Sequence, residues 1–325
     1  MLPASAFFFH DLQCRSGLGD RLLDVWAAKT IARLHSPDRV LAVHWHDGRR
    51  FASFVGDYST QGFSVAGCTF ADSAPPGALA LPDVFSHTAL NDRGLVCLAS
   101  DVWQVILRTG MIWGNSPPDR LHADRTFYSL DPSLSLDVVI ATYRDVASHT
   151  APALAIEAAL PPGIDGCVGV HLRLGDKLVA QETAVDMSEP TWRALEQRTL
   201  AYLDTCLARG ERFFLCSDDP GYKAALAHHL RARGALVITS DPARAPRALL
   251  GSAALVDFFA LSRCASIVQM TKYSTFSLAA ALASGVPLVN LFHDTTGSGH
   301  RLDTWRSALA AVSLTTLADA RSVLP

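Results

Sequence analysis

The residue types best suited to chemistry gather where buried strands are expected to end, and the densest group is segment 169–177. It reads Gly-Val-His-Leu-Arg-Leu-Gly-Asp-Lys and places His171, Arg173 and Lys177 at the end of an apolar run. Residues two apart on a strand share a face, so His171 and Arg173 project together. A guanidinium there can hold two phosphate oxygens, which an ammonium does less specifically. The pattern predicts an anion site, with a surface turn held by a His–Asp or Lys–Asp pair as the alternative.

A glycine turn near the amino terminus is the second candidate. Gly17, Gly19 and Asp20 stand between the first expected strand and the first long helix, with Arg15 and Arg21 on either side. Glycine lets the backbone approach a ligand, and the free N–H groups of a helix start attract an anion. The fingerprint G-x-G-x-x-G is left incomplete, which disfavours an NAD enzyme. A tight strand-to-helix turn that binds nothing is the alternative.

Two carboxylates follow the apolar run 213–217. Asp218 and Asp219 precede a proline that can open the next helix. A carboxylate here can accept the N–H groups of a purine such as guanine. On this segment alone, simple capping of the helix by Ser or Asp is the better interpretation.

Hydroxyl groups mark the last candidate, at the start of an alanine-rich helix. Ser274, Thr275, Phe276 and Ser277 follow the apolar run 265–270. Hydroxyls and free backbone N–H groups at a helix start suit phosphate. A Ser or Thr helix cap is the alternative.

Other reaction types lack their usual patterns. The sequence has no Asp-x-Asp, no H-E-x-x-H and no G-x-S-x-G, and His44 with His46 is more typical of exposed strand positions than of a metal pair. We therefore expect no metal ligands and no serine-hydrolase nucleophile.

Composition bounds the class of protein. The chain has 325 residues, 49% of them hydrophobic and 18% charged, and a formal net charge of −3. This is enough apolar material for two moderate domains, and it excludes global disorder and a generally basic surface for nucleic acid. No apolar run reaches the roughly 18–20 residues of a membrane span, and run 6–9 is too short for a signal peptide. Cys97, Cys167 and Cys216 lie inside apolar runs, so we expect reduced thiols and a cytoplasmic enzyme.

Short apolar runs alternate with longer helical stretches, which is typical of an α/β protein with parallel strands covered on both faces. The expected strands are 6–10, 39–45, 94–98, 137–141, 166–172, 212–217, 235–239, 265–270 and 286–292. The expected helices are 19–34, 150–160, 191–209, 221–233, 248–263 and 276–283. Segments 69–93 and 113–125 are expected to be loops. Two prolines and two glycines in 160–166 predict a domain boundary there.

The order of the motifs resembles a known family. Gly-Leu-Gly-Asp at 17–20, Gly-Val-His-Leu-Arg at 169–173, Leu-Cys-Ser-Asp at 215–218, Ala-Leu-Val-Asp at 254–257, Leu-Ser-Arg-Cys at 261–264 and Ser-Thr-Phe-Ser at 274–277 follow one another. In this order they resemble the inverting α-1,6-fucosyltransferases, most closely the rhizobial nodulation fucosyltransferases. The wider group includes core α-1,6-, α-1,2- and protein O-fucosyltransferases. The resemblance covers nearly the whole chain and is densest after Gly166.

This resemblance implies a glycosyltransferase of the GT-B type, an α/β fold with two Rossmann-like domains facing across a cleft. Residues 1–160 would form the acceptor-side domain, and residues 161–325 the domain that binds the nucleotide sugar. The implied reaction moves fucose from GDP-fucose to a glycan hydroxyl with inversion, without a metal or another cofactor. The implied partners are the nucleotide-sugar donor and a glycan acceptor.

The resemblance also implies roles in donor binding. Arg173 matches the family arginine on the β-phosphate, and His171 matches the histidine beside the guanosine. Asp219, or its neighbour Asp218, matches the carboxylate that reads guanine. The matching phosphate-binding turn is Ser274, Thr275, Phe276 and Ser277.

Catalysis is implied to involve Arg173, helped by Lys177, and the loop with Gly17, Gly19 and Asp20 that closes over the donor. The chain also departs from the family, because Leu174 stands where many relatives carry a second basic residue. No catalytic base can be matched in the first half. A different nucleotide-sugar donor, or a non-catalytic relative that binds nucleotide or glycan, stays open.

Overall fold

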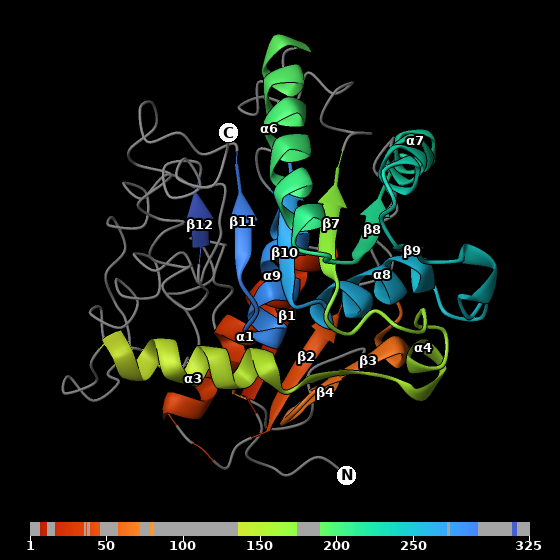
Figure 1. Cartoon of the computed structure of the whole chain (residues 1–325). Helices are drawn as coiled ribbons and strands as arrows, with labels where there is room; N and C mark the ends of the chain where they lie inside the picture. Colours follow the sequence, from red (N-terminus) through yellow and green to blue (C-terminus); the bar gives the residue numbers. More distant parts are fainter. Residues whose placement is uncertain are drawn as a thin grey trace. The chain divides into compact units, whose positions relative to one another are not determined.

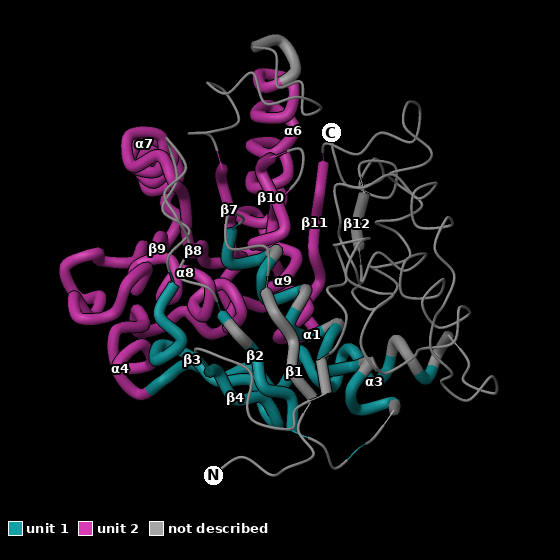
Figure 2. The backbone as a smooth tube through the Cα atoms, turned by 180° about the vertical axis from the view of Figure 1, so that it is seen from behind, with its two compact units in different colours: residues 1–153, 303–311 teal, residues 154–302, 312–325 magenta. Residues whose placement is uncertain are grey.

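A computed structural model describes residues 7–11, 17–35, 37, 40–45, 58–71, 79–80, 136–173, 189–271, 274–291 and 314–316. The chain divides into two compact units, one of residues 1–153 and 303–311 and the other of residues 154–302 and 312–325, so the first division falls between Ala153 and Leu154 (Figure 2). The predicted linker at 160–166 follows that point and belongs to the second unit.

The first unit is built on a parallel sheet. Among its described strands the order is β4-β2-β1-β5, where β1 is Phe7–Asp11, β2 Leu41–Trp45, β4 Cys68–Phe70 and β5 Leu79–Ala80. Two further strands, β3 (Phe63–Val65) and β6 (Thr150–Pro152), pair antiparallel beside it. Starting at β1, the parallel strands extend first to one side and then to the other, which is the winding of a Rossmann-like sheet.

Helix α1 (Leu18–His35) packs against α3 (Leu136–Ser148) through aromatic side chains. Trp26 is fully buried, and its ring meets Tyr143 edge-on with centroids 6.3 Å apart. The indole N–H donates to the Thr150 hydroxyl at 2.8 Å, so the polar edge of this large side chain is satisfied inside the core.

The second unit holds a parallel sheet of six described strands in the order β12-β11-β10-β7-β8-β9. They are β7 (Val168–Leu172), β8 (Phe213–Ser217), β9 (Val237–Thr239), β10 (Ser266–Met270), β11 (Leu288–Asn290) and β12 (Leu314–Thr316). Counted along the chain within the unit, this is the Rossmann order 3-2-1-4-5-6. The first strand of this unit is β7. The next two strands, β8 and β9, lie on one side of it, and β10 follows on the other side.

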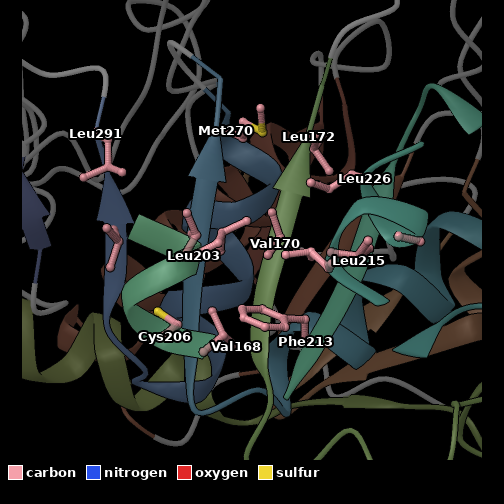
Figure 3. Close-up of a cluster of buried hydrophobic side chains, with 14 of the residues drawn as sticks. Val168, Val170, Leu172, Leu203, Cys206, Phe213, Leu215, Leu226, Met270 and Leu291 are labelled. Carbon is pink, nitrogen blue, oxygen red and sulfur yellow. The ribbon is translucent and has the colours of Figure 1, made fainter. Parts of the chain in front are cut away.

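One face of this sheet packs against α6 (Glu189–Ala208) and α7 (Pro220–Ala232) (Figures 1 and 3). Val168, Val170 and Leu172 alternate along β7 and join Leu203 of α6 and Leu226 of α7 in the core. The other face is covered by α8 (Ser252–Ser262) and α9 (Thr275–Ser284). Burial on both faces explains why the strands are continuous apolar runs, and each buried Val or Leu contributes roughly 1.5–3 kcal/mol.

Two predicted elements of the first half are wrong. Segment 137–141 was expected to be a strand because it is rich in β-branched residues, but it lies inside α3. The buried residues Tyr143, Val146 and Ala147 recur with helical spacing, and this longer period prevails over local propensity.

Segment 150–160 was expected to be a helix, but it begins with strand β6 and contains only the short helix α4 (Leu154–Glu157). Pro152 lacks an N–H group and cannot continue a helix, but it fits an edge strand. Strand β5 and the last two residues of β4 lie in the segment predicted as a loop, 69–93, so this prediction is wrong there. The predicted strand 94–98 and loop 113–125 lie outside the described residues.

Candidate functional site

A row of polar side chains crosses the second sheet near the carboxyl ends of its strands, at the next-to-last residue of β7, β8 and β10 and the last residue of β11. The strand pairings align Cys216 of β8 with His171 of β7, His171 with Gln269 of β10, and Gln269 with Asn290 of β11. Paired residues point to the same face of a sheet, and here the face is the one covered by α8 and α9. Cys216, His171, Gln269 and Asn290 are all buried, and we call them the polar row.

The polar row passes through the point where the winding of the sheet reverses. β7 and β10 are neighbours, yet the connections from them lead to opposite edges. In open α/β sheets, ligands bind outside the carboxyl ends of the strands at this switch point. From the order of the sheet, a ligand is therefore expected beside the segments that directly follow β7 and β10.

The structure brings two of the sequence-predicted groups together at that point. The His171 ring stacks on the Phe276 ring with centroids 5.1 Å apart and an interplanar angle of 28°. Phe276 also meets Phe258 of α8 edge-on, at 5.6 Å. Arg173 directly follows β7 and is partly exposed. Segments about 100 residues apart in the sequence thus meet at one end of the sheet.

His171 is a neutral side chain in this site. Burial, helped by the charge of Arg173, lowers the pKa of His171 from 6.5 to about 3. A neutral imidazole has one donor and one acceptor nitrogen, so it can bind a polar ligand group without carrying charge itself. Its Nδ1 is buried and has no hydrogen-bond partner among the residues that the structure describes.

Two further buried hydroxyl groups, between β10 and α9, resemble His171 Nδ1 in their lack of a hydrogen-bond partner among the described residues. Thr271 Oγ1 and Ser274 Oγ have no partner within the described part of the chain. Ser274 is the N-cap residue of α9 but makes no side-chain cap, so the first N–H groups of the helix are not satisfied by it. An unpaired buried polar group costs roughly 1–3 kcal/mol, and such groups are often explained by a bound water or ligand.

Ser277, also predicted for phosphate binding, lies deeper than its neighbours. It is fully buried, and its hydroxyl lies 2.8 Å from the Gln269 side-chain amide and 3.3 Å from the Ser274 carbonyl oxygen. Thr275 is also buried. Ser277 thus faces the sheet and holds the start of α9 through its contacts with Gln269 and Ser274.

The two carboxylates after β8 have different surroundings. Asp219 is the N-cap of α7, because its Oδ1 accepts from the Tyr222 backbone N–H at 2.9 Å. Its own N–H donates to the Ser217 hydroxyl at 3.0 Å. Asp218 is exposed. The geometry thus gives Asp219 the helix-capping role that its sequence context favoured.

Asp257 of α8 is a candidate that sequence reasoning did not single out. Burial raises its pKa, while hydrogen bonding to Ser240, the charge of Lys223 and hydrogen bonding to Cys216 lower it in turn. Its Oδ1 is buried without a partner among the described residues. The residue belongs to the motif 254–257, but only the packing of α8 against β8 shows that one of its carboxylate oxygens is buried.

The predicted loop of the first unit is described in part. Gly17 and Gly19 lie at the start of α1, where the Gly17 carbonyl accepts from the Arg21 N–H at 3.2 Å. Asp20 is in the first turn, and its side chain lies outside the described residues, as does Lys177. The Arg21 guanidinium is fully buried 3.7 Å above the Trp45 ring, so it packs inside the first unit and does not form an exposed anion site.

Within the described ranges, no three His, Cys, Asp or Glu side chains are close enough to hold a metal ion. The described cysteines are free, and Cys167 and Cys216 are buried as expected, whereas Cys97 lies outside the description. No described helix is long and apolar enough to cross a membrane.

The described sheets define an α/β protein with two parallel, Rossmann-like sheets. No family model and no curated protein matches the chain. Among solved structures it is similar to a NodZ fucosyltransferase from Bradyrhizobium, with 18% identity over 87% of this chain and 95% of that chain, and a TM-score of 0.46.

Two other similar structures are a POFUT1 complex with GDP and the heptosyltransferase WaaC of E. coli with ADP. The first is 12% identical over 89% of this chain and 99% of that chain, with a TM-score of 0.47. The second is 16% identical over 96% and 93%, with a TM-score of 0.41.

Proposed function

We propose that this chain is a metal-independent glycosyltransferase of the GT-B type that moves fucose from GDP-fucose to a glycan hydroxyl with inversion. The observation that carries the proposal is the convergence at the β7/β10 switch point of Arg173, neutral His171 and the start of α9. The order of the sequence motifs supports the choice of donor.

The start of α9 suits the diphosphate of such a donor. A helix N-terminus carries partial positive charge and free N–H donors, and here the N-cap hydroxyl is not used to satisfy them. Ser274 Oγ and Thr271 Oγ1 add two buried hydroxyls next to that terminus. Arg173 adds a permanent positive charge from the neighbouring strand end.

The chemistry follows from the charge that must be stabilised. As the glycosidic bond of the donor breaks, negative charge grows on the departing nucleoside diphosphate. Arg173 and the α9 N-terminus stabilise that charge, with Lys177 as a proposed second cation. The acceptor hydroxyl attacks the sugar carbon from the opposite side and loses its proton, which gives inversion in one displacement. Gly17, Gly19 and Asp20 are proposed to contact the donor from the first unit.

Guanine is proposed to be read by a carboxylate. The motif resemblance favours Asp219 or Asp218, while the geometry adds Asp257, whose buried Oδ1 is unpartnered in the described structure. We expect Asp257→Asn to raise the KM for the donor more than Asp219→Asn, because asparagine can still cap α7. Steady-state kinetics on both variants decide between the carboxylates, and a larger effect from Asp219→Asn would favour the capping residue.

The test of donor binding is calorimetric titration of the chain with GDP, UDP and ADP in excess EDTA. We expect GDP to bind, UDP and ADP to bind much more weakly, and Arg173→Ala to lose GDP affinity. Arg233→Ala is the matched control, because its guanidinium pairs with Asp204 where α7 ends, away from the carboxyl ends of the strands. Equal binding of GDP and UDP, or binding that needs manganese, would contradict the donor or the metal independence.

Enzymatic function needs its own assay. A fucosyltransferase is expected to release GDP from GDP-fucose slowly into water even without an acceptor, and Arg173→Ala is expected to reduce that release. GDP binding without any hydrolysis, under conditions where bound donor is saturating, would support a nucleotide-binding protein instead.

A further inference from the structure

Gln269 occupies an unusual place for an amide. It lies in the middle of a six-stranded parallel sheet with no exposed surface, between His171 and Asn290 in the polar row. A buried side-chain amide is costly unless its donors and acceptor are paired. The hydrogen-bond partners of the Gln269 amide therefore indicate its structural role.

The amide of Gln269 is satisfied by the start of α9 and by β11. With the amide oriented so that its oxygen faces N–H donors, Nε2 donates to Ser277 Oγ at 2.8 Å and to the Ser274 carbonyl oxygen at 3.3 Å. Oε1 accepts from the Ser274 backbone N–H at 3.1 Å and from Asn290 Nδ2 at 2.9 Å. Both backbone groups of Ser274 are thus held by one side chain from the neighbouring strand. The opposite orientation instead lets Nε2 donate to the Thr271 carbonyl oxygen at 3.3 Å, but it places the amide oxygen and nitrogen against like groups of the other neighbours.

This arrangement replaces the usual N-cap of a helix. In most helices the N-cap hydroxyl bonds back to the first turn, but Ser274 does not do so, and its backbone is extended (φ −146°, ψ 113°). Because Gln269 fixes that residue from the sheet, the Ser274 hydroxyl does not cap the first turn of α9 and has no partner within the described residues. Phe276 lies in the first turn of α9 and stacks on His171. The hydrogen bonds from Gln269 to Ser274 therefore also fix the position of this ring stack.

We propose that Gln269 is a positioning residue that holds the N-terminus of α9 open for the phosphate groups of a nucleotide. The proposal rests on the proposed function, because it takes the start of α9 as the phosphate site. Gln269 itself is buried behind Ser274 and Ser277 and does not touch the ligand. Its removal is therefore expected to weaken binding of the phosphates and to leave binding of the nucleoside unchanged.

The experiment compares GDP with guanosine on Gln269→Met, a substitution of similar length that cannot form these hydrogen bonds. Calorimetry is expected to show roughly tenfold weaker GDP binding, equivalent to the loss of one or two hydrogen bonds, and an unchanged affinity for guanosine. Equal losses for both ligands would overturn the proposal, because they would show general damage to the site. Unchanged GDP binding would overturn it as well.

A second pair of variants serves if Gln269→Met does not fold. Ser277→Ala removes one partner of Gln269, whereas Ser284→Ala removes a hydroxyl that donates to the Ala280 carbonyl oxygen in the last turn of the same helix. We expect a loss of GDP affinity, with guanosine binding intact, for Ser277→Ala alone. Identical behaviour of the two variants would overturn the proposal. If the unaltered chain bound no GDP, the proposed function would fail first, which separates the two failures.

Discussion

At the scale of single residues, His171 and Arg173 share one strand end but differ in charge. Arg173 is permanently cationic, and its positive charge helps burial to keep His171 neutral. We propose two different functions for them, with Arg173 as the cation that contacts the leaving group and His171 as the neutral ring that packs beside it. Two measurements separate them.

The first concerns turnover. Arg173→Ala is expected to lower kcat on the true donor by on the order of 10²–10³, because one donor to the developing negative charge is removed. Arg173→Lys is expected to recover only part of the rate, since an ammonium cannot hold two oxygens in the same way. Steady-state kinetics with the donor at saturation provide the measurement, with circular dichroism to confirm folding. A near-normal kcat for Arg173→Ala would show that this arginine is not the phosphate contact.

The second concerns stability against pH. The pKa of His171 is about 3 in the folded chain and 6.5 as its ordinary value, so the unfolded chain takes up this proton first. Stability from the neutral ring is complete above about pH 6.5 and is lost as the pH falls toward 3, by up to roughly 1.4 kcal/mol for each pH unit. Urea unfolding of the chain and of His171→Gln at pH 7, 6 and 5 measures it. We expect a steeper loss in the unaltered chain, and parallel curves would contradict the buried neutral histidine.

At the scale of secondary-structure elements, β7 is pressed closely against α8. A Cβ atom added to Gly169 would lie 2.8 Å from Leu261 Cδ2 and 3.0 Å from Cys264 Sγ, and both neighbours are buried. The glycine therefore sets the distance between the sheet and α8, which carries Asp257. This close approach allows α8 to cover the polar row.

Gly169→Ala is accordingly expected to lower the free energy of unfolding by about 1–3 kcal/mol, because a methyl group is forced into a filled core. The control is Gly221→Ala in the exposed first turn of α7, where the nearest atom is Asp219 Oδ1 at 3.3 Å. Alanine is preferred there for helix formation, so no loss is expected. A tolerated alanine at position 169 would mean that α8 can move away from β7.

Much of the second unit could be predicted from the sequence, because parallel strands buried on both faces form apolar runs with clear ends. β7, β8, β9, β10 and β11 lie where those runs lie. In the first half, the β-propensity of 137–141 predicted a strand where α3 lies. Segment 150–160 was predicted as a helix, but Pro152 cannot continue a helix, and the segment forms a strand and a short helix.

The candidate site was predictable at its strand ends and not in its interior. His171, Arg173 and Ser274 stand out because polar residues follow apolar runs. Gln269 could not be recognised in that way, because its importance depends on pairing with His171 and Asn290 and on contact with α9. Pairings between strands far apart in the sequence are fixed only by the order of the sheet.

At the scale of the whole molecule, both described parallel sheets wind outward from their first strand in two directions. The switch point of the second sheet carries the polar row and the start of α9, which has no side-chain cap. Buried polar atoms of His171, Thr271 and Ser274 lie there without a partner among the described residues. The central claim is that a nucleoside diphosphate binds there.

A crystal structure of the chain grown with GDP in the presence of EDTA tests this claim most directly. We expect the diphosphate at the N-terminus of α9, with an oxygen within hydrogen-bond distance of Ser274 Oγ and of the Arg173 guanidinium. We expect the base toward the carboxyl ends of β8 and β9, near Asp257. GDP bound at any other place, such as the glycine turn before α1 alone, would show that the start of α9 is not the nucleotide site.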